Sequence, residues 1–203
     1  MSSIKPLFKS GETVIIASHN SGKIDEFKTL FSKYNLKIKT SAELNVKDVI
    51  ENGKTFEENS ILKVKSISNQ KIVIGDDSGL CVNSLNNMPG IFSARFAREC
   101  GGWDKAMKRI YQDLIKKSDN FSAKFVCSLS IKFLEDKIFS YYGEIHGEIT
   151  WPPKGGNGFG YDPFFIPNSY DKTFAEMDHK EKILIDHRSV ALKNLIISHL
   201  DDS

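Results

Sequence analysis

The sequence predicts an α/β protein in which strands alternate with helices. A β-branched apolar run at residues 13–17 precedes a helical segment at residues 24–34. A second helical segment at residues 56–68 precedes another apolar run at residues 71–75. Along residues 121–133, apolar and polar side chains alternate, as in a strand with one face on the core. Strands interleaved with helices in this way are typical of α/β domains.

The composition is that of an ordinary globular protein. The 203 residues are 40% hydrophobic and 27% charged, and the formal net charge is +2. A charge so close to neutral gives no general reason to expect binding to nucleic acid or to a membrane, because such proteins usually carry a net basic patch. No linker, repeat or low-complexity tract divides the chain, so we expect a single domain over residues 1–203.

The cysteines and the amino terminus favour a cytoplasmic location. Cys81, Cys100 and Cys127 are odd in number and widely spaced, which argues against a disulfide framework and against a zinc site. We expect them to be buried thiols in a reducing compartment. Residues 1–10 lack the apolar core of a signal peptide, and no apolar run in the sequence approaches the length of a membrane span.

The first strand leads into a turn that suits an anion. Residues 18–23 are polar and directly precede the helix 24–34. Backbone N–H groups and the dipole at a helix amino terminus favour a phosphate, and Lys23 adds a full positive charge. The alternative is a polar helix cap at Asn20 with an exposed lysine, since the segment lacks the usual P-loop pattern.

The next helix and strand carry local boundary signals. Thr55 and Glu58 fit a capping box, in which each side chain satisfies the other's backbone N–H, at the start of the helix 56–68. Residues 71–75 are predicted to form a buried strand that ends in a polar turn at residues 76–79. Open α/β sheets usually bind ligands at the carboxyl ends of their strands.

Asp76 and Asp77 are the first candidates for chemistry. Two adjacent carboxylates at a strand end form a hard oxygen site for Mg²⁺, which keeps several waters and takes further ligands from substrate phosphates. Glu51 and Glu58 are candidates for additional ligands or bases. The alternative is that residues 76–79 form only a turn, because Asp, Ser and Gly are common turn residues.

Three further elements are predicted in the second half of the chain. A helix is expected over Trp103–Lys117, and residues 137–150 are expected to pair as a hairpin with the strand 121–133. A last helix is expected over residues 186–200. Its apolar face carries Leu192, Leu195, Ile196 and His199.

A loop at residues 151–162 combines glycines and prolines with aromatic side chains. Its glycines flank Phe159 and Tyr161, so the loop can offer stacking and backbone hydrogen bonds to a nucleobase; a plain hairpin connection is the alternative. A cationic cluster near the start of the last helix suits a phosphate or a base edge, with a solvated charged face as the alternative. The members of this cluster are Lys180, Lys182, His187 and Arg188.

Together these candidates describe a nucleoside triphosphate site. A lysine at a helix amino terminus suits phosphates, acids suit magnesium, and an aromatic loop suits a base. In such a site Mg²⁺ neutralises the phosphates while a carboxylate orients or deprotonates the attacking water.

Six ordered blocks, spread over nearly the whole chain, resemble one family. The blocks are residues 17–23 (ASHNSGK), 53–60 (GKTFEENS), 76–80 (DDSGL), 89–96 (PGIFSARF), 158–163 (GFGYDP) and 186–188 (DHR). In these residues the chain resembles the inosine triphosphate pyrophosphatase family, the dITP/XTP pyrophosphatases that hydrolyse non-standard purine nucleoside triphosphates.

The resemblance implies an ITPase-like α/β fold, with an elongated mixed sheet and flanking helices that form two lobes around a nucleotide cleft. It also implies a homodimer, a magnesium requirement, and cleavage between the α- and β-phosphates to give a nucleoside monophosphate and pyrophosphate. The implied substrates are ITP, dITP and XTP.

The resemblance also implies roles for individual residues. Asp77 would accept the proton of water and bind magnesium, with Asp76 beside it and Glu51 as a further metal ligand. Another group would bind the substrate, with the ring of Phe159 stacked on the purine. Its members are Ser18, His19, Asn20, Ser21, Gly22, Lys23, Ser78, Phe159, Gly160, Tyr161, Asp162, Lys182, His187 and Arg188.

Two other functions fit part of this pattern. A Maf-like pyrophosphatase would act on pyrimidine or modified triphosphates with similar chemistry, although the blocks 158–163 and 186–188 argue against it. A nucleotide-binding module without turnover would keep Lys23 and the aromatic loop and would have no need of Asp77.

Overall fold

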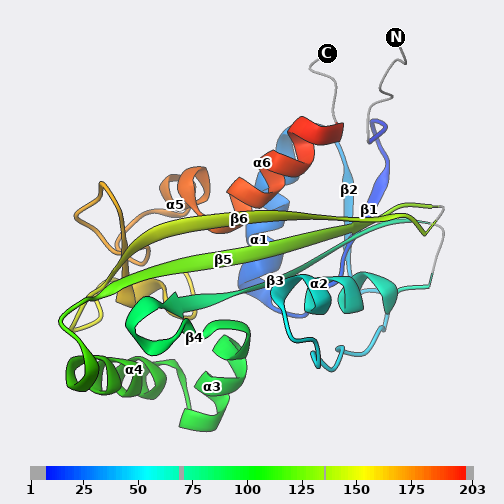
Figure 1. The fold of residues 1–203 in the computed structure, drawn as a ribbon. Coiled ribbons are helices and arrows are strands. Elements are labelled where there is room, and N and C mark those ends of the chain that lie inside the picture. Colours follow the sequence, from blue (N-terminus) through cyan, green and yellow to red (C-terminus); the bar gives the residue numbers. More distant parts are fainter. Residues whose placement is uncertain (1–7, 69–70, 135, 200–203) are drawn as a thin grey trace. The chain divides into compact units, whose positions relative to one another are not determined.

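The computed structural model describes residues 8–68, 71–134 and 136–199, and these form two compact units (Figure 1). The first unit comprises Met1–Asp77, Ser128–Gly143 and Arg188–Ser203, and the second comprises Ser78–Cys127 and Glu144–His187. The single domain that the sequence predicts over residues 1–203 stays a prediction.

The described strands form one mixed sheet. Its order is β2-β1-β3-β5-β6-β7, and β4 pairs with β3. The β1–β2 and β1–β3 pairs are parallel, whereas the β3–β4 and β6–β7 pairs are antiparallel. The strands are β1 (Thr13–Ile16), β2 (Lys37–Thr40), β3 (Ile72–Val82), β4 (Met88–Pro89), β5 (Ser122–Lys132), β6 (Ile138–Ile149) and β7 (Phe165–Pro167).

Helices flank these strands, which confirms the predicted mixed α/β class. The α-helices are α1 (Ser21–Phe31), α2 (Phe56–Lys65), α3 (Ser93–Cys100), α4 (Trp103–Lys117), α5 (His179–Ile185) and α6 (His187–His199). Single-turn 3₁₀ helices lie at Ser32–Tyr34, Asn83–Leu85, Gly90–Phe92 and Asp162–Phe164.

In the first unit, α2 lies on one side of the strands and α6 on the other (Figure 1). The face of α2 that meets the sheet carries Val64, which is fully buried and packs in one cluster with Ile15 of β1 and Val73 of β3. Removing such apolar side chains from water is the main driving force for docking the helix.

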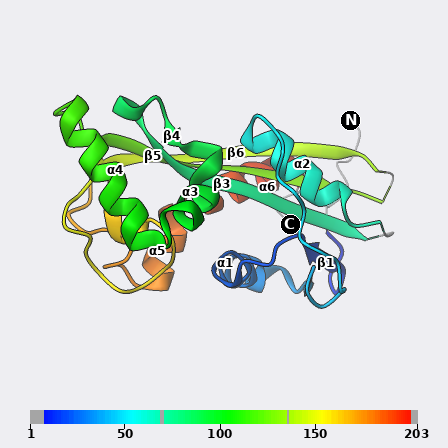
Figure 2. The ribbon, with the colours of Figure 1, turned by 90° about the horizontal axis from the view of Figure 1, so that it is seen from below.

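In the second unit, α3 and α4 lie side by side, as the view in Figure 2 shows. The helix predicted over Trp103–Lys117 is confirmed, and its buried stripe is Ala106, Met107, Ile110 and Leu114. Next to it, the ring of Phe125 on β5 packs edge-to-face on Phe165 of β7, with 4.9 Å between centroids. Aromatic pairs in this geometry add to the free energy gained from burial.

The predicted helix starts are largely confirmed. Helix α1 begins at Ser21, three residues before the predicted start, because the Asn20 side chain caps it and accepts from the backbone N–H of Lys23 at 3.1 Å. Thr55 caps α2 in the same way and accepts from the N–H of Glu58 at 3.1 Å. The Glu58 carboxylate accepts from the N–H of Lys54 at 2.6 Å, one residue before the partner that a capping box predicts.

The turn predicted at residues 76–79 is wrong, because β3 continues through these residues to Val82. Asp76 and Asp77 are 1% and 4% exposed. The Lys23 ammonium binds the carboxylate of Asp76, and the Asn59 amide binds that of Asp77. These long-range partners outweigh the local turn preference of Asp.

The prediction that β5 has only one face on the core is wrong for its second half. Ser128, Ser130 and Lys132, predicted on the polar face, are 0%, 0% and 5% exposed. The Ser60 hydroxyl of α2 lies 2.7 Å from the Ser130 hydroxyl, and the Lys132 ammonium donates to the Ile67 carbonyl at 2.5 Å. A helix therefore covers this face, and hydrogen bonds satisfy its polar groups.

The predicted last helix begins at His187, one residue later than expected. Leu192 and Leu195 are buried as predicted, whereas Leu200 and the side chain of His199 lie outside the described residues. Lys182 belongs to the separate helix α5, which ends at the extended residue Asp186. The predicted cationic cluster is therefore spread over two helices.

All three cysteines are free thiols, and the predicted burial is confirmed for Cys81 and Cys127 but wrong for Cys100, which is half-buried. Burial raises the pKa of Cys81 to about 11, so this thiol is neutral at physiological pH. Within the described part of the chain, no helix combines the length and the apolar character needed to cross a membrane. The cytoplasmic location stays a prediction.

Gly79→Ala tests whether residue 79 lies inside a packed strand. A Cβ there would lie 2.3 Å from the Gly90 carbonyl oxygen and 2.5 Å from the Ser93 hydroxyl. We expect the free energy of unfolding to fall by about 1–3 kcal/mol through overpacking, measured by denaturant titration. Gly156→Ala is the control, because a Cβ at residue 156 meets nothing within 4 Å. Equal stabilities of the two variants would contradict the close approach at Gly79.

Candidate active site

The predicted site residues are divided between the two units. The first unit holds Ser18, His19, Asn20, Ser21, Gly22, Lys23, Glu51, Asp76, Asp77 and Arg188. The second unit holds Ser78, Phe159, Gly160, Tyr161, Asp162, Lys182 and His187.

Asp76 is a buried carboxylate held by two cations. Its Oδ2 lies 3.0 Å from Lys23 Nζ and 2.9 Å from an amino nitrogen of Arg188. Arg188 is fully buried and also pairs with Glu26 of α1. Burial alone would favour the neutral acid, but the Lys23 and Arg188 charges hold the pKa of Asp76 well below its usual range. Asp76 is therefore ionised, and it anchors Lys23.

The adjacent acid, Asp77, has a different environment. Its Oδ2 accepts a hydrogen bond from the Asn59 amide of α2 at 2.9 Å, and its Oδ1 lies 3.7 Å from Lys63 Nζ. Burial raises the pKa of Asp77 above its usual value, although the charges of Lys63 and Lys23 oppose this. A carboxylate with a raised pKa is a stronger base, which suits proton transfer from water.

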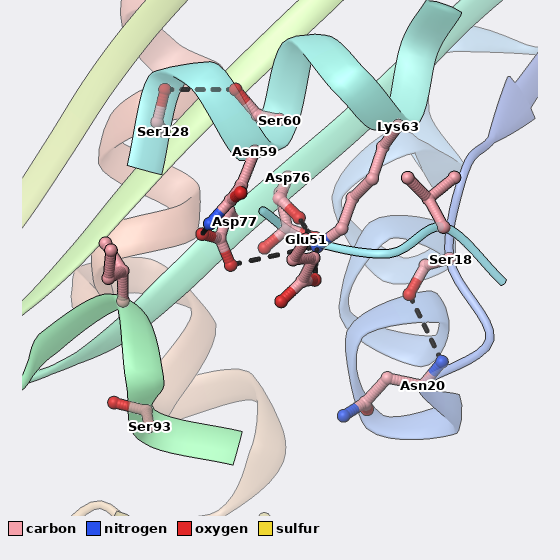
Figure 3. A network of polar contacts seen from close by, with 12 residues as sticks. Ser18, Asn20, Glu51, Asn59, Ser60, Lys63, Asp76, Asp77, Ser93 and Ser128 are labelled. Atoms are coloured by element: carbon pink, nitrogen blue, oxygen red, sulfur yellow. Dashed lines mark hydrogen bonds and ion pairs between the residues drawn. The ribbon is translucent and has the colours of Figure 1, made fainter. Parts of the chain in front are cut away.

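Several oxygens converge on the ammonium of Lys63, as Figure 3 shows. Lys63 Nζ lies 2.6 Å from Glu51 Oε1 and 2.7 Å from the carbonyl oxygen of Asp76, in addition to its approach to Asp77. Burial would lower the pKa of Lys63, but the charges of Asp77, Asp76 and Glu51 together raise it. The group is therefore built around a positive charge.

Of the three predicted magnesium ligands, two have oxygens that face the Lys63 ammonium and suit Mg²⁺. These two are Glu51 and Asp77. In the described residues, no three His, Cys, Asp or Glu side chains gather into a complete metal site. Glu51 and Asp77 nevertheless both approach the Lys63 ammonium, and Mg²⁺ commonly takes one or two carboxylates together with waters and substrate phosphates. The third predicted ligand, Asp76, directs its Oδ2 to Lys23 and Arg188.

The segment 18–23 leads into the first turn of α1, which begins at Ser21. The Ser18 hydroxyl accepts from the Asn20 N–H at 3.2 Å, and Ser21 and Gly22 open the first helical turn, which contains no acidic residue. The His19 ring contacts the Val46 carbonyl at 2.9 Å and so joins this segment to residue 46. The first helical turn and the Lys23 ammonium, which is anchored on Asp76, are features that suit an anion.

In the second unit, Asp162 organises the predicted aromatic loop. Its Oδ2 accepts from Lys182 Nζ at 2.6 Å and from the backbone N–H of Phe159 at 2.8 Å. Gly158, at φ +74°, passes so close that a Cβ would lie 2.2 Å from the same oxygen. The Lys182 ammonium lies 4.8 Å from the centroid of the Phe159 ring. One buried ion pair thus fixes the lysine and the loop together.

The remaining second-unit residues differ in exposure. Tyr161 is buried, and its hydroxyl donates to the Ser93 carbonyl at 3.2 Å, so it anchors the loop. The His187 ring is also buried and stacks on Phe125 at 4.9 Å. Ser78, Phe159 and Gly160 are half-buried, and they keep surface that a ligand can reach.

Glu26, Asn59 and Lys63 are site residues that the sequence analysis missed. Asn59 and Lys63 lie four residues apart on α2, so they share a helix face, and this spacing was the available signal. On an amphipathic helix, however, a lysine usually lies in solvent, and only the tertiary structure places Lys63 among carboxylates. Glu58, considered as a ligand or base, instead accepts from the Lys54 N–H.

Comparisons with known proteins give consistent matches. Residues 14–197 match the sequence model of the Ham1 family. The chain is 38% identical over 191 residues to a protein of Zymomonas mobilis named dITP/XTP pyrophosphatase, covering 92% of this chain and 91% of that protein. It is 41% identical over 193 residues to a Bacillus cereus protein of the same name, covering 92% and 94%. The Ham1 protein of Staphylococcus aureus superposes with a TM-score of 0.80 at 37% identity, covering 92% of this chain and 97% of that one.

Asp76→Asn tests the buried ion pairs that Asp76 forms with Lys23 and Arg188. We expect it to lower the free energy of unfolding at pH 7 by about 3–5 kcal/mol, because it leaves buried cations uncompensated. The pKa of Asp76 is depressed on folding, so its contribution is present above the unfolded pKa of about 4 and is lost as the pH falls below that value. The variant should therefore lose less stability than the parent between pH 5 and pH 3, the range we would cover by urea denaturation.

Asp48→Asn is the matched control for this prediction, because the Asp48 side chain is 78% exposed. It should leave the stability at pH 7 nearly unchanged. An Asp76→Asn variant as stable as this control would contradict the proposed importance of the buried charges.

Proposed function

This chain belongs to the Ham1 family, and from that premise we propose that it hydrolyses the non-standard purine nucleoside triphosphates dITP, XTP and ITP. The products are the nucleoside monophosphate and pyrophosphate. The observation that carries the proposal is the contrast between two adjacent acids: two cations bind Asp76, whereas Asp77 meets an amide and a lysine of α2. The pKa values of the two acids shift in opposite directions accordingly. Neighbouring carboxylates with diverging pKa values are a common arrangement where one of them performs acid–base chemistry.

Asp77 acts as the general base. Its carboxylate takes a proton from water, the water oxygen forms a bond to phosphorus, and the bond between the α-phosphate and β-phosphate breaks as pyrophosphate leaves. Asn59 orients the carboxylate through its hydrogen bond to Oδ2. The side chain of Asp77 is only 6% exposed, so bulk water competes little for it.

The phosphates bind to positive groups of the first unit. Lys23 and the N–H groups at the start of α1 contact them, with Ser18, Asn20 and the residues between them shaping the turn. Arg188 supports this role indirectly, since it neutralises Asp76, which in turn holds Lys23. When bound, Mg²⁺ would neutralise phosphate oxygens and polarise phosphorus, with Glu51 and Asp77 as its protein ligands.

The residues proposed to recognise the base belong to the second unit. The half-buried ring of Phe159 stacks on the purine, while Lys182 and His187 donate to its 6-oxo edge. Adenine presents an amino group at this position, which would leave those donors unpaired at about 1–3 kcal/mol each. A site of this kind therefore rejects ATP.

A homodimer and a magnesium requirement complete the proposal. Analytical ultracentrifugation measures the oligomeric state, and a chelator titration measures the metal requirement. An active monomer would contradict the proposed homodimer. Full turnover in excess chelator would contradict the proposed magnesium requirement.

Product analysis over a panel of nucleotides tests the substrate class. With magnesium present, we expect pyrophosphate from dITP, XTP and ITP and little turnover of ATP, measured by chromatography that separates pyrophosphate from orthophosphate. Turnover of dTTP or UTP instead would indicate a Maf-like enzyme. Tight binding without turnover would indicate a nucleotide-binding module.

Asp77→Asn tests the assignment of the base. We expect kcat to fall by about 10²–10⁴-fold, because an amide cannot accept the proton, while the circular dichroism spectrum stays that of the parent. Asp136→Asn, at a carboxylate of the same unit whose side chain is 86% exposed, should keep parental kcat. Unchanged turnover in Asp77→Asn would overturn the mechanism.

A further inference from the structure

Glu51 and Asp77 are the two carboxylates that face the Lys63 ammonium. The side-chain amide of Asn59 contacts Asp77 directly and also contacts the segment that carries Glu51. The Asn59 side chain is fully buried on the first turn of α2. The Nδ2 group donates to Asp77 Oδ2 at 2.9 Å, and the Oδ1 atom accepts from the backbone N–H of Gly53 at 2.8 Å. Gly53 lies two residues from Glu51, so Asn59 joins the segment that carries Glu51 to the strand that carries Asp77.

The Glu51 segment depends on such side-chain contacts for its position. Residues 46–53 belong to no helix or strand, so no regular backbone ladder holds them. A Cβ on Gly53 would lie 2.7 Å from Asn59 Oδ1 and 2.7 Å from the Glu58 Cβ. Glycine at residue 53 is therefore what lets the backbone come within hydrogen-bond distance of the Asn59 amide.

Asn59 is itself well fixed. The Thr55 side chain caps α2 at its start, and Val64 of the same helix packs in one buried cluster with Ile15 and Val73. Both contacts restrict the helix that carries the amide. Asn59 can therefore transmit a defined position from the helix to Gly53 and Asp77.

The chemistry of an amide suits both contacts at once. Asparagine offers an acceptor for the Gly53 N–H and a donor for the Asp77 carboxylate, as these two neighbours require. Aspartate would keep the first contact and place a second negative charge against Asp77. Alanine would lose both contacts.

We propose that Asn59 is a positioning residue that sets the spacing of Glu51 and Asp77, the pair whose oxygens face a cation in the first unit. Its catalytic consequence rests on the proposed function, whereas its hold on the Glu51 segment does not. Residues that orient the ligands of a metal typically change metal affinity or activity by 10–100-fold when replaced.

Two replacements of Asn59 separate its two contacts. In Asn59→Ala, we expect backbone amides near Gly53 to exchange hydrogen about 2- to 12-fold faster, the factor for one lost hydrogen bond. In Asn59→Asp, exchange near Gly53 should stay close to that of the parent. Mass spectrometry of peptides that span residues 51–54, with no metal or nucleotide added, measures both.

Turnover should respond differently from exchange. Both variants should lower kcat or raise the magnesium concentration at half-maximal rate by about 10-fold or more, because both lose the donor to Asp77. Asn59→Asp should thus combine a parental exchange rate near Gly53 with impaired turnover. A merely structural role would move exchange and turnover together.

Ser60→Ala is the matched control, since Ser60 is an equally buried neighbour on α2 that hydrogen bonds to serine hydroxyls of β5. It should change neither the magnesium dependence nor the exchange near Gly53. Gly53→Ala supplies a second route if Asn59→Ala fails to fold, because the new Cβ displaces the segment while Asn59 stays intact. This variant should also raise the magnesium concentration at half-maximal rate.

The outcomes distinguish this inference from the proposed function. Parental magnesium dependence and parental exchange in Asn59→Ala, in an enzyme that turns over dITP, would overturn the role of Asn59 and leave the function standing. If the parent turns over no nucleotide, the proposed function fails, and the exchange comparison alone still decides whether Asn59 holds the Glu51 segment.

Discussion

The buried charge of Asp76 is the constraint on which the first unit depends. A carboxylate this far from water is stable only when cations compensate it, and those cations come from α1 and α6 as Lys23 and Arg188. The same interaction therefore ties two helices to β3 and places a lysine at the amino terminus of α1. It also explains why β3 runs on through residues whose composition is that of a turn.

The alternation of a strand then gives the next residue a different role. Because successive side chains of a strand point to opposite faces, Asp76 meets α1 and α6, whereas Asp77 meets Asn59 and Lys63 of α2. Asp77 receives less compensation for its burial, which raises its pKa. One acid consequently stabilises the fold, and its neighbour is the residue that we propose as the base.

In the second unit, a buried ion pair fixes the position of a loop. The buried pair of Asp162 and Lys182 fixes the glycine-rich loop through the Phe159 N–H, and the buried Tyr161 anchors the following turn. Polar groups that are fully paired define one conformation, since each unpaired alternative is costly. The half-buried ring of Phe159 is thereby held in place and keeps part of its surface free of protein contacts.

The sequence by itself determined the local elements and the family. The caps at Asn20 and Thr55 and the stripe of α4 are encoded within a few residues, and the ordered blocks carried the family resemblance that the matches confirm. Only the tertiary structure decided the course of β3, the burial of Ser130 and the different environments of the two acids. The physical reason is distance along the chain, since the partner of Asp76 is 112 residues away and that of Ser60 is 70 residues away. Local conformational propensity carries no information about such distant partners. Their interactions nevertheless outweigh it, because buried charges and hydroxyls must be paired.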